Sequence, residues 1–307
     1  MTRRTAVSLR DSLTENFSIS PIKSIGDTQM GSGNTYLVST ETGQYMAKLG
    51  ERMDFLRIYE KSAQALTRKG FCVGRIVKTR RNELCTNDGV TLYEYIEGDC
   101  HSTLDKVQTE KAIHYVKAFN KALGTVPFLP DEIENKTVWD HAKSVDFLSG
   151  PFMKTFLPSF DGEGKAELIA AIHKLQKNRD MLDAQSHQLI HSDLGADNFV
   201  FSGNEVVSII DFTPEYANEW YAICQFLYWN LLWQKARVAW PEIEETLDAY
   251  GSGYAREAVA LLLLKAAVYR VAAPIMDAVD RGTLDGLNLG KRMHILSNVL
   301  SLQAELD

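Results

Sequence analysis

The sequence predicts an α+β protein in which an antiparallel sheet forms a first lobe, residues 1–97, and helices form most of a second lobe, residues 98–307. Two hairpin patterns predict the sheet, one at 36–49 around a Thr-Gly turn and one at 75–97 around an Asn-Asp-Gly turn. After Gly98 the apolar residues recur at helical spacing, which indicates helices with one buried face. A chain of 307 residues is long enough for each lobe to bury a core.

The other elements follow from apolar spacing and from residues that begin or end helices. Helical spacing predicts helices at 6–17, 54–71 and 165–185, one or two helices at 103–126, and an extended segment at 17–25. Asp54 is the expected N-cap of the second helix and Gly70 its C-cap. The stretch 127–164 contains short helical pieces, and we expect it to form part of the substrate side or a lid.

The most apolar stretch begins at Ala258 and is broken by Lys265 and Arg270. Its uninterrupted run is far shorter than the ~20 residues that a helix needs to cross a bilayer. We therefore expect a buried C-terminal helix and no membrane partner.

Composition excludes several classes of function. The net charge of −7 argues against a nucleic-acid partner, since a phosphate backbone attracts basic surface, and it mildly favours a cationic substrate. The four cysteines form no C-x-x-C pair, which indicates reduced thiols in a cytoplasmic protein rather than zinc ligands or a disulfide framework. The N-terminus carries positive charges with no apolar run behind them, so we expect no secretory signal.

The segment HSDLGADNFVFSGNEVVSIID, residues 191–211, contains the strongest functional motif. Two strand-like runs flank a Ser-Gly-Asn turn, the pattern of a β-hairpin, which would return Asp211 to the loop that carries Asp193 and Asn198. Such a set can divide the work of phosphoryl transfer between a base and two metal ligands. The alternative is a polar turn with no chemistry. Four residues in register, counting His191, argue against it.

The pattern H-x-D-x-x-x-x-N, followed by IIDF at 209–212, resembles the aminoglycoside phosphotransferase/choline kinase family, the small-molecule branch of the protein-kinase-like fold. The resemblance implies a bilobal, ATP- and Mg²⁺-dependent phosphotransferase. Its acceptor would be a hydroxyl of a small molecule: an amino alcohol, an aminoglycoside or a sugar-like metabolite. By resemblance, Asp193 is the catalytic base, and Asn198 and Asp211 bind Mg²⁺. His191 is expected to shape the catalytic loop rather than transfer a proton.

A glycine-bearing turn and a lysine precede this motif. Gly31 and Gly33 lie just before the first hairpin strand, and backbone amides in such a turn can approach phosphates closely. Lys48 ends the second strand and can point inward while its neighbours face the other way. Glycine turns are common in hairpins, so the turn is informative mainly through its position before Lys48.

The resemblance assigns the nucleotide contacts. The expected cofactor-binding residues are Gly31, Ser32, Gly33, Asn34, Lys48, Glu60, Glu94, Tyr95 and Ile96. Lys48 would hold the α- and β-phosphates and pair with Glu60 on the following helix, because Glu51 comes too soon after the strand. A solvated helix charge is the alternative for Glu60. Backbone groups of residues 94–96 would bind adenine, where a strand leads into the helical lobe.

Two positions depart from the family pattern. Thr213-Pro214 follows IIDF where the family often has an acidic residue or glycine, and Ala222 stands where the family usually has an aspartate that supports the catalytic loop. These departures motivate an alternative function, a catalytically weak nucleotide-binding regulator. Protein phosphorylation is disfavoured, because no activation-loop segment separates IIDF from the next helical pattern.

All five tryptophans lie in the second lobe, and four of them fall within 21 residues of one another. With Glu215 and Glu219 nearby, these rings could form a pocket for an amine or a quaternary ammonium. Trp229 and Trp233 also have the i, i+4 spacing of a helix that packs into a core. We favour the core for most of these rings.

Overall fold

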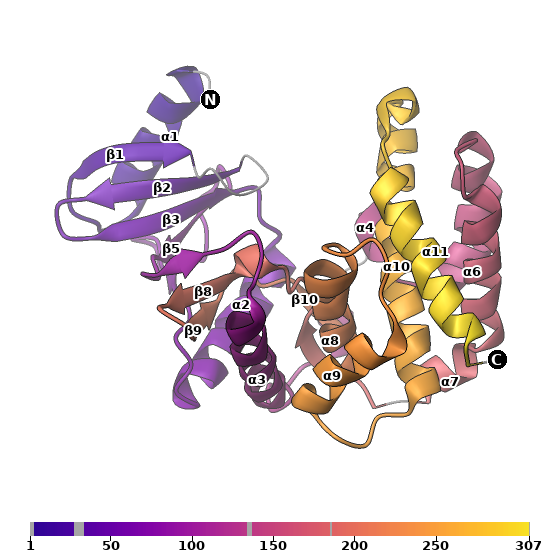
Figure 1. Ribbon diagram of the computed structural model, residues 1–307. Coiled ribbons are helices and arrows are strands. Elements are labelled where there is room, and N and C mark those ends of the chain that lie inside the picture. Colours follow the sequence, from indigo (N-terminus) through magenta and orange to yellow (C-terminus); the bar gives the residue numbers. More distant parts are fainter. Residues whose placement is uncertain (1–2, 28–33, 134–136, 185, 307) are drawn as a thin grey trace.

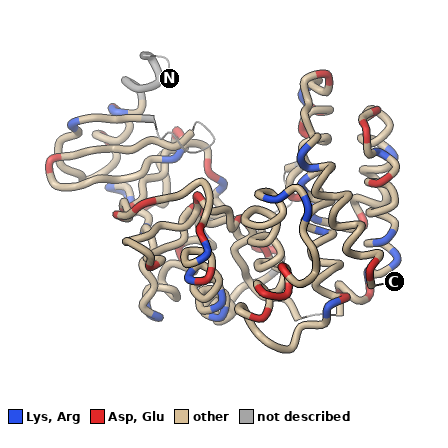
Figure 2. The backbone as a smooth tube through the Cα atoms, in the orientation of Figure 1, with Lys and Arg blue, Asp and Glu red and all other residues tan. Residues whose placement is uncertain are grey.

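The computed structural model describes residues 3–27, 34–133, 137–184 and 186–306, which form a strand-rich first lobe and a larger helical second lobe (Figure 1). The predicted α+β fold is confirmed. The boundary between residues 97 and 98 stays a prediction. Lys, Arg, Asp and Glu are interspersed along both lobes, so the net negative charge is not concentrated in one of them (Figure 2).

The first lobe is built on an antiparallel sheet of five strands. In spatial order these are β1 (Ile22–Asp27), β2 (Thr35–Thr40), β3 (Gln44–Leu49), β5 (Val90–Glu94) and β4 (Ile76–Val77). The first predicted hairpin is confirmed as β2 and β3, which join at a tight turn where Thr40 N–H donates to the Gly43 carbonyl. The second is confirmed only in part, because β4 has two residues and an irregular segment links it to β5.

Helices cover both faces of this sheet. On one face, α1 (Arg3–Asn16) and the residue Phe17 contribute to an apolar cluster with β2, β3 and β5. On the other face, Leu56 of α2 (Met53–Arg68) packs with Ile76 and Tyr93. The predicted N-cap of α2 was wrong, because the helix begins at Met53 and Asp54 lies buried in its first turn, where Arg52 binds it.

The second lobe is mainly helical. Its helices are α3 (Lys106–Leu123), α4 (Val138–His141), α5 (Val145–Phe147), α6 (Lys165–Lys177), α7 (Arg179–Asp183), α8 (Glu219–Leu227), α9 (Trp240–Tyr250), α10 (Arg256–Arg281) and α11 (Gly290–Ala304). α10 is long and apolar enough to span a bilayer, but 83% of its apolar window is buried inside the molecule, as expected for a core helix. It packs against α8 and α11 (Figure 1).

Two small sheets connect the helices to the candidate site. β7 (Gln188–His191) pairs antiparallel with β10 (Pro214–Ala217), and β8 (Phe199–Ser202) pairs with β9 (Glu205–Ile209) and with β6 (Asp99–Cys100). The predicted 199–209 hairpin is confirmed. Its two-residue turn has Gly203 at φ 61°, a left-handed conformation that glycine adopts without strain.

Candidate active site

The loop between β7 and β8 is fixed at both ends. The Ser192 N–H donates to the Thr213 carbonyl at 2.9 Å, which continues the β7–β10 pairing beyond His191. Leu194 is fully buried in the core of the second lobe, and the side-chain amide of Asn230 donates to its carbonyl at 2.8 Å. This loop therefore presents its polar side chains from a rigid backbone.

His191 is buried and connects the loop to the strand that leads to Asp211. Its Nδ1 accepts the Asp193 N–H at 3.1 Å, so Nε2 carries the proton and donates to the Ile210 carbonyl at 3.2 Å. Burial lowers the pKa of the imidazole, so the ring is neutral near pH 7. This geometry supports a role in shaping the loop.

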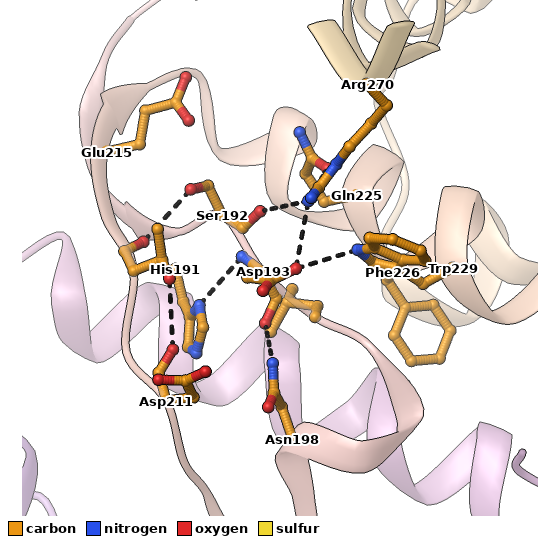
Figure 3. A network of polar contacts seen from close by, with 12 residues as sticks. His191, Ser192, Asp193, Asn198, Asp211, Glu215, Gln225, Phe226, Trp229 and Arg270 are labelled. Carbon is orange, nitrogen blue, oxygen red and sulfur yellow. Dashed lines mark hydrogen bonds and ion pairs between the residues drawn. The ribbon is translucent and has the colours of Figure 1, made fainter. Parts of the chain in front are cut away.

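Asp193 is held through one carboxylate oxygen. Its Oδ1 accepts the indole N–H of Trp229 at 3.0 Å and the Nη2 of Arg270 at 3.1 Å (Figure 3). Among the described residues, no hydrogen bond or ion pair uses Oδ2. One oxygen is therefore fixed, while the other is available to a hydroxyl group.

The β8–β9 hairpin brings Asn198 next to Asp211. Phe199 pairs with Ile209, and the Ile210 N–H donates to the Asn198 carbonyl at 2.9 Å. The Asn198 side-chain amide donates to the Asp193 carbonyl at 2.9 Å. Asp211 has φ 55°, a conformation that is uncommon outside glycine and that often marks functional sites.

Lys48 reaches this site from the first lobe. Its Nζ lies 2.5 Å from Oδ1 of Asp211 and 3.9 Å from Oε1 of Glu51. Partial burial acts to raise the pKa of Asp211, but the charge of Lys48 and its hydrogen bond outweigh this and lower it. Asp211 is therefore ionised at neutral pH.

The predicted Lys48–Glu60 pair was wrong. Glu60 pairs with Lys78 at 2.9 Å, because its face of α2 points toward the segment after β4. Glu51 reaches Lys48 because the chain turns sharply at Gly50, which has φ 75°. Tyr93 donates to Glu51 at 2.7 Å, and burial raises the pKa of the Glu51 carboxyl.

The oxygen ligands near Asp211 suit a magnesium ion that takes most of its other ligands from phosphate and water. Among the described residues, no group of three or more His, Cys, Asp or Glu side chains could hold a metal. Asn198 and Asp211 offer an amide and a carboxylate oxygen. Mg²⁺ is commonly bound by one or two such groups together with phosphate oxygens and water.

The expected nucleotide-binding residues are only partly described. Gly31, Ser32 and Gly33 lie outside the described residues. The Asn34 carbonyl accepts the Leu49 N–H at 3.0 Å, so Asn34 lies beside the end of β3. At the predicted adenine-binding segment, Glu94 ends β5, and its N–H donates to the Arg75 carbonyl.

The aromatic cluster is mostly core, as we favoured. Tyr221, Phe226, Tyr228 and Trp240 are buried, and Glu215 is buried between Lys143 at 3.3 Å and Lys265 at 4.0 Å. The less buried rings of Trp229 and Trp233 make cation–π contacts with basic side chains of the protein itself. The Arg270 guanidinium lies 4.6 Å from the Trp229 ring, and Lys291 Nζ lies 4.4 Å from the Trp233 ring.

The family is decided by sequence. The family model described as "Phosphotransferase enzyme family" matches residues 29–214, more than half of the 307-residue chain. The chain belongs to the phosphotransferase enzyme family. The matched part contains Lys48, the 191–198 loop and Asp211. The residues that meet in the structure therefore all lie within the part of the chain that the family model matches.

Solved structures resemble this phosphotransferase along almost its whole length. The choline kinase LicA from Streptococcus pneumoniae is 14% identical, with a TM-score of 0.68 over 98% of this chain and 99% of that chain. A spectinomycin phosphotransferase in complex with ADP and spectinomycin is 16% identical, with a TM-score of 0.63 over 97% of each chain. These likenesses show the protein-kinase-like fold. No curated protein matches the sequence.

Sequence reasoning missed three contributors to the site: Glu51, Gln225 and Arg270. Gln225 accepts from Arg270, and Arg270 reaches Asp193 from α10. A charged residue inside an apolar helix was the available signal for Arg270, because a buried charge requires a partner. Neither Glu51 nor Gln225 stands out in its local sequence.

Proposed function

We propose that this phosphotransferase transfers the γ-phosphoryl group of ATP to a hydroxyl of a small molecule, with Asp193 as the base. The observation that carries the proposal is the meeting of Asp193, Asn198, Asp211 and Lys48 at one place, from two lobes and three separate segments. Positioning and charge neutralisation supply most of the catalysis in phosphoryl transfer, and these residues provide both.

In the proposed reaction the acceptor hydroxyl lies against Oδ2 of Asp193. Its oxygen attacks the γ-phosphorus, the bond between that phosphorus and the bridging oxygen of ADP breaks, and the hydroxyl proton passes to Asp193. Lys48 neutralises charge on the phosphates. Mg²⁺, when bound by Asn198 and Asp211, would neutralise the β- and γ-phosphate oxygens.

The nucleotide is proposed to lie between the lobes. Among the described residues, no backbone hydrogen bond uses the N–H of Tyr95 or Ile96, so both are available to the edge of an adenine. The turn Gly31-Ser32-Gly33-Asn34 is proposed to cover the phosphates from the strand beside Lys48. Structures of related fold contain AMP or AMP-PNP, which supports ATP as the donor.

The acceptor is proposed to be an amino alcohol, an aminoglycoside or a sugar-like metabolite. Related structures contain hygromycin B, spectinomycin or an amicoumacin kinase's ligand, so small hydroxyl compounds are the natural class to test. Arg270 and Lys291 lie over the rings of Trp229 and Trp233, respectively, so cations of the protein itself already make cation–π contacts with both rings.

The alternative function, a catalytically weak regulator, depended on Ala222 and Thr213. Loop contacts from Asn230 and Arg270 provide support that Ala222 cannot. The Thr213 carbonyl accepts the Ser192 N–H, so the residue after IIDF takes part in holding the loop. No described contact favours the regulator.

The test is ATP turnover with Mg²⁺ and a panel of acceptors: choline, spectinomycin, homoserine and a hexose. The proposal expects at least one acceptor to raise ADP release by the native protein, and Asp193→Asn to abolish that increase. If ATP binds with Mg²⁺ but no acceptor raises turnover above that of Asp193→Asn, the proposal fails in favour of the regulator.

A further inference from the structure

Arg270 connects the core of the second lobe to the catalytic loop. It lies in the middle of α10 and is 8% exposed. Its Nη2 lies 3.1 Å from Asp193 Oδ1, 3.1 Å from Gln225 Oε1 and 3.5 Å from the Ser192 carbonyl (Figure 3). One nitrogen of the guanidinium therefore contacts the backbone of the loop, the side chain of Asp193 and helix α8 at once.

The backbone of Arg270 is also held in an unusual way. Pro274 lies four residues later in α10 and has no N–H to donate to the Arg270 carbonyl. Arg292 of α11 replaces that donor, with Nη1 at 2.7 Å from the carbonyl oxygen. The packing of α11 on α10 thus fixes the residue whose side chain reaches Asp193.

Aromatic rings enclose the guanidinium. Its central carbon lies 4.6 Å from the ring of Trp229, 5.2 Å from that of Tyr269 and 5.9 Å from that of Tyr228. Burial lowers the pKa of Arg270, but the charge of Asp193 opposes this and the net shift is upward. The guanidinium is therefore a fixed positive charge within a rigid surround.

We propose that Arg270 is a positioning residue for phosphoryl transfer: together with Trp229 it holds Oδ1 of Asp193, so that Oδ2 faces the acceptor hydroxyl. This inference rests on the proposed function. It also accounts for Ala222, which has no polar side chain for the loop. Gln225, three residues later in α8, binds Arg270, and Arg270 binds the loop.

A purely structural role makes a different prediction. A buried arginine that only balances charge could be replaced by methionine with loss of stability, while the orientation of the Asp193 carboxylate stayed the same. A positioning role requires that the carboxylate turn when Arg270 is removed. The Trp229 indole N–H donates to the same Oδ1, so its protection against hydrogen exchange reports whether the carboxylate keeps that orientation, without any need for an acceptor. The position of its NMR resonance does not report this, because the guanidinium lies 4.6 Å from the Trp229 ring and its removal alone would shift the resonance.

The test compares native protein with Arg270→Met, Arg270→Lys and the control Arg281→Met. Arg281 lies at the exposed end of the same helix, where it pairs with Asp277. For each folded protein we would measure kcat and the KM for ATP with the acceptor panel, and the hydrogen-exchange rate of the Trp229 indole N–H, whose ¹H–¹⁵N resonance is assigned with Trp229→Phe. Should Arg270→Met not fold, Arg270→Gln takes its place.

Positioning predicts that kcat falls about 100-fold in Arg270→Met, since small misplacements of catalytic groups cost this much. The KM for ATP should stay within a factor of about two, because Lys48 and the expected adenine-binding residues 94–96 are untouched. Arg270→Lys should recover part of kcat. The Trp229 indole N–H should exchange faster in Arg270→Met and at the native rate in Arg281→Met.

Unchanged kcat, or a Trp229 indole N–H that exchanges at the native rate in Arg270→Met, would overturn the inference. Failure of the proposed function is a separate result. If the native protein turns over no acceptor, the reaction is wrong, and the exchange rate of the Trp229 indole N–H then decides whether Arg270 positions Asp193.

Discussion

Lys48 of the first lobe and Asp211 of the second lobe face each other, with Nζ 2.5 Å from Oδ1. Lys48 is the penultimate residue of β3 and Asp211 follows β9, so their contact joins the two lobes at the place where phosphates are proposed to bind. Glu51 Oε1 lies 3.9 Å from the same Nζ. The ammonium therefore has two carboxylate partners, only one of which is a candidate metal ligand.

Replacing Lys48 tests its proposed contact with the phosphates. Lys48→Met should raise the KM for ATP and lower kcat together, by about 10-fold or more in kcat/KM, since a charge-assisted contact to phosphate is lost. Steady-state kinetics at saturating Mg²⁺ measure both constants. Lys78→Met is the matched control, because Lys78 binds Glu60 instead. Equal effects of the two substitutions would contradict the assignment.

The corrected partner of Lys48 gives a second prediction. Glu51→Gln should raise the KM for ATP several-fold, on the order of 1 kcal/mol of binding, because it removes a half-buried charge next to Lys48. Glu60→Gln should leave the KM within a factor of about two, since Glu60 pairs with Lys78 and not with Lys48. A larger effect at Glu60 than at Glu51 would restore the sequence-based pairing.

His191 makes stability depend on pH. Its folded-state pKa lies below the ordinary value of 6.5 because the ring is buried, so below that pH the unfolded chain binds a proton that the folded protein does not. The contribution of His191 to the free energy of unfolding should therefore be fully present above pH 6.5. It should be lost as the pH is lowered from there toward the folded-state pKa.

Urea unfolding of the native protein and of His191→Asn between pH 5 and 7.5 measures this contribution. In this variant the asparagine at position 191 has a side-chain oxygen that can accept the Asp193 N–H, but its side chain does not titrate in this range. The native curve should fall more steeply than that of the variant on the acid side. Parallel curves would mean that His191 is not the group responsible.

In the buried cluster of Lys143, Glu215 and Lys265, replacing the two lysines should lower the free energy of unfolding by different amounts. Lys143 lies closer to Glu215. Burial lowers the pKa of Lys143, but the charge of Glu215, its hydrogen bond and the charges of Tyr269 and Asp140 together raise it. Burial dominates at Lys265 and lowers its pKa. Lys143→Met should thus lower the free energy of unfolding by about 3 kcal/mol, as expected when one partner leaves a buried ion pair.

Lys265→Met should cost less, about 1 kcal/mol, because methionine avoids the desolvation of an ammonium that is poorly compensated. Denaturant unfolding at neutral pH gives both values. The reverse order would show that Lys265, rather than Lys143, is the main partner of Glu215.

The parts of the site that were predictable are those encoded locally. His191, Asp193, Asn198 and Asp211 belong to one loop and one hairpin. The turn at Gly203 and a register shift between Val200 and Phe201 together bring Asn198 and Asp211 next to each other. Lys48 followed from the alternation of a single hairpin strand. Strand pairing and turns of this kind depend on a few neighbouring residues.

The parts that were missed depend on how helices pack and rotate. Arg270 is 77 residues from Asp193, and its reach into the loop depends on the packing of α10 against α8 and α11. The partner of Glu60 depends on which face of α2 turns toward β4, which helical spacing does not specify. Glu51 was excluded because a helix was assumed to carry the acid, while the left-handed turn at Gly50 brings it to Lys48 without one.

The central claim is that a phosphoryl group moves from ATP to a small hydroxyl compound under the control of Asp193. The most direct measurement is ³¹P NMR of Mg·ATP incubated with the acceptor panel and either native protein or Asp193→Asn. The account predicts ADP and a new phosphomonoester resonance with the native protein, and a rate about 1,000-fold lower with the variant. ATP that binds but yields no phosphomonoester, or an ester formed equally fast by Asp193→Asn, would contradict it.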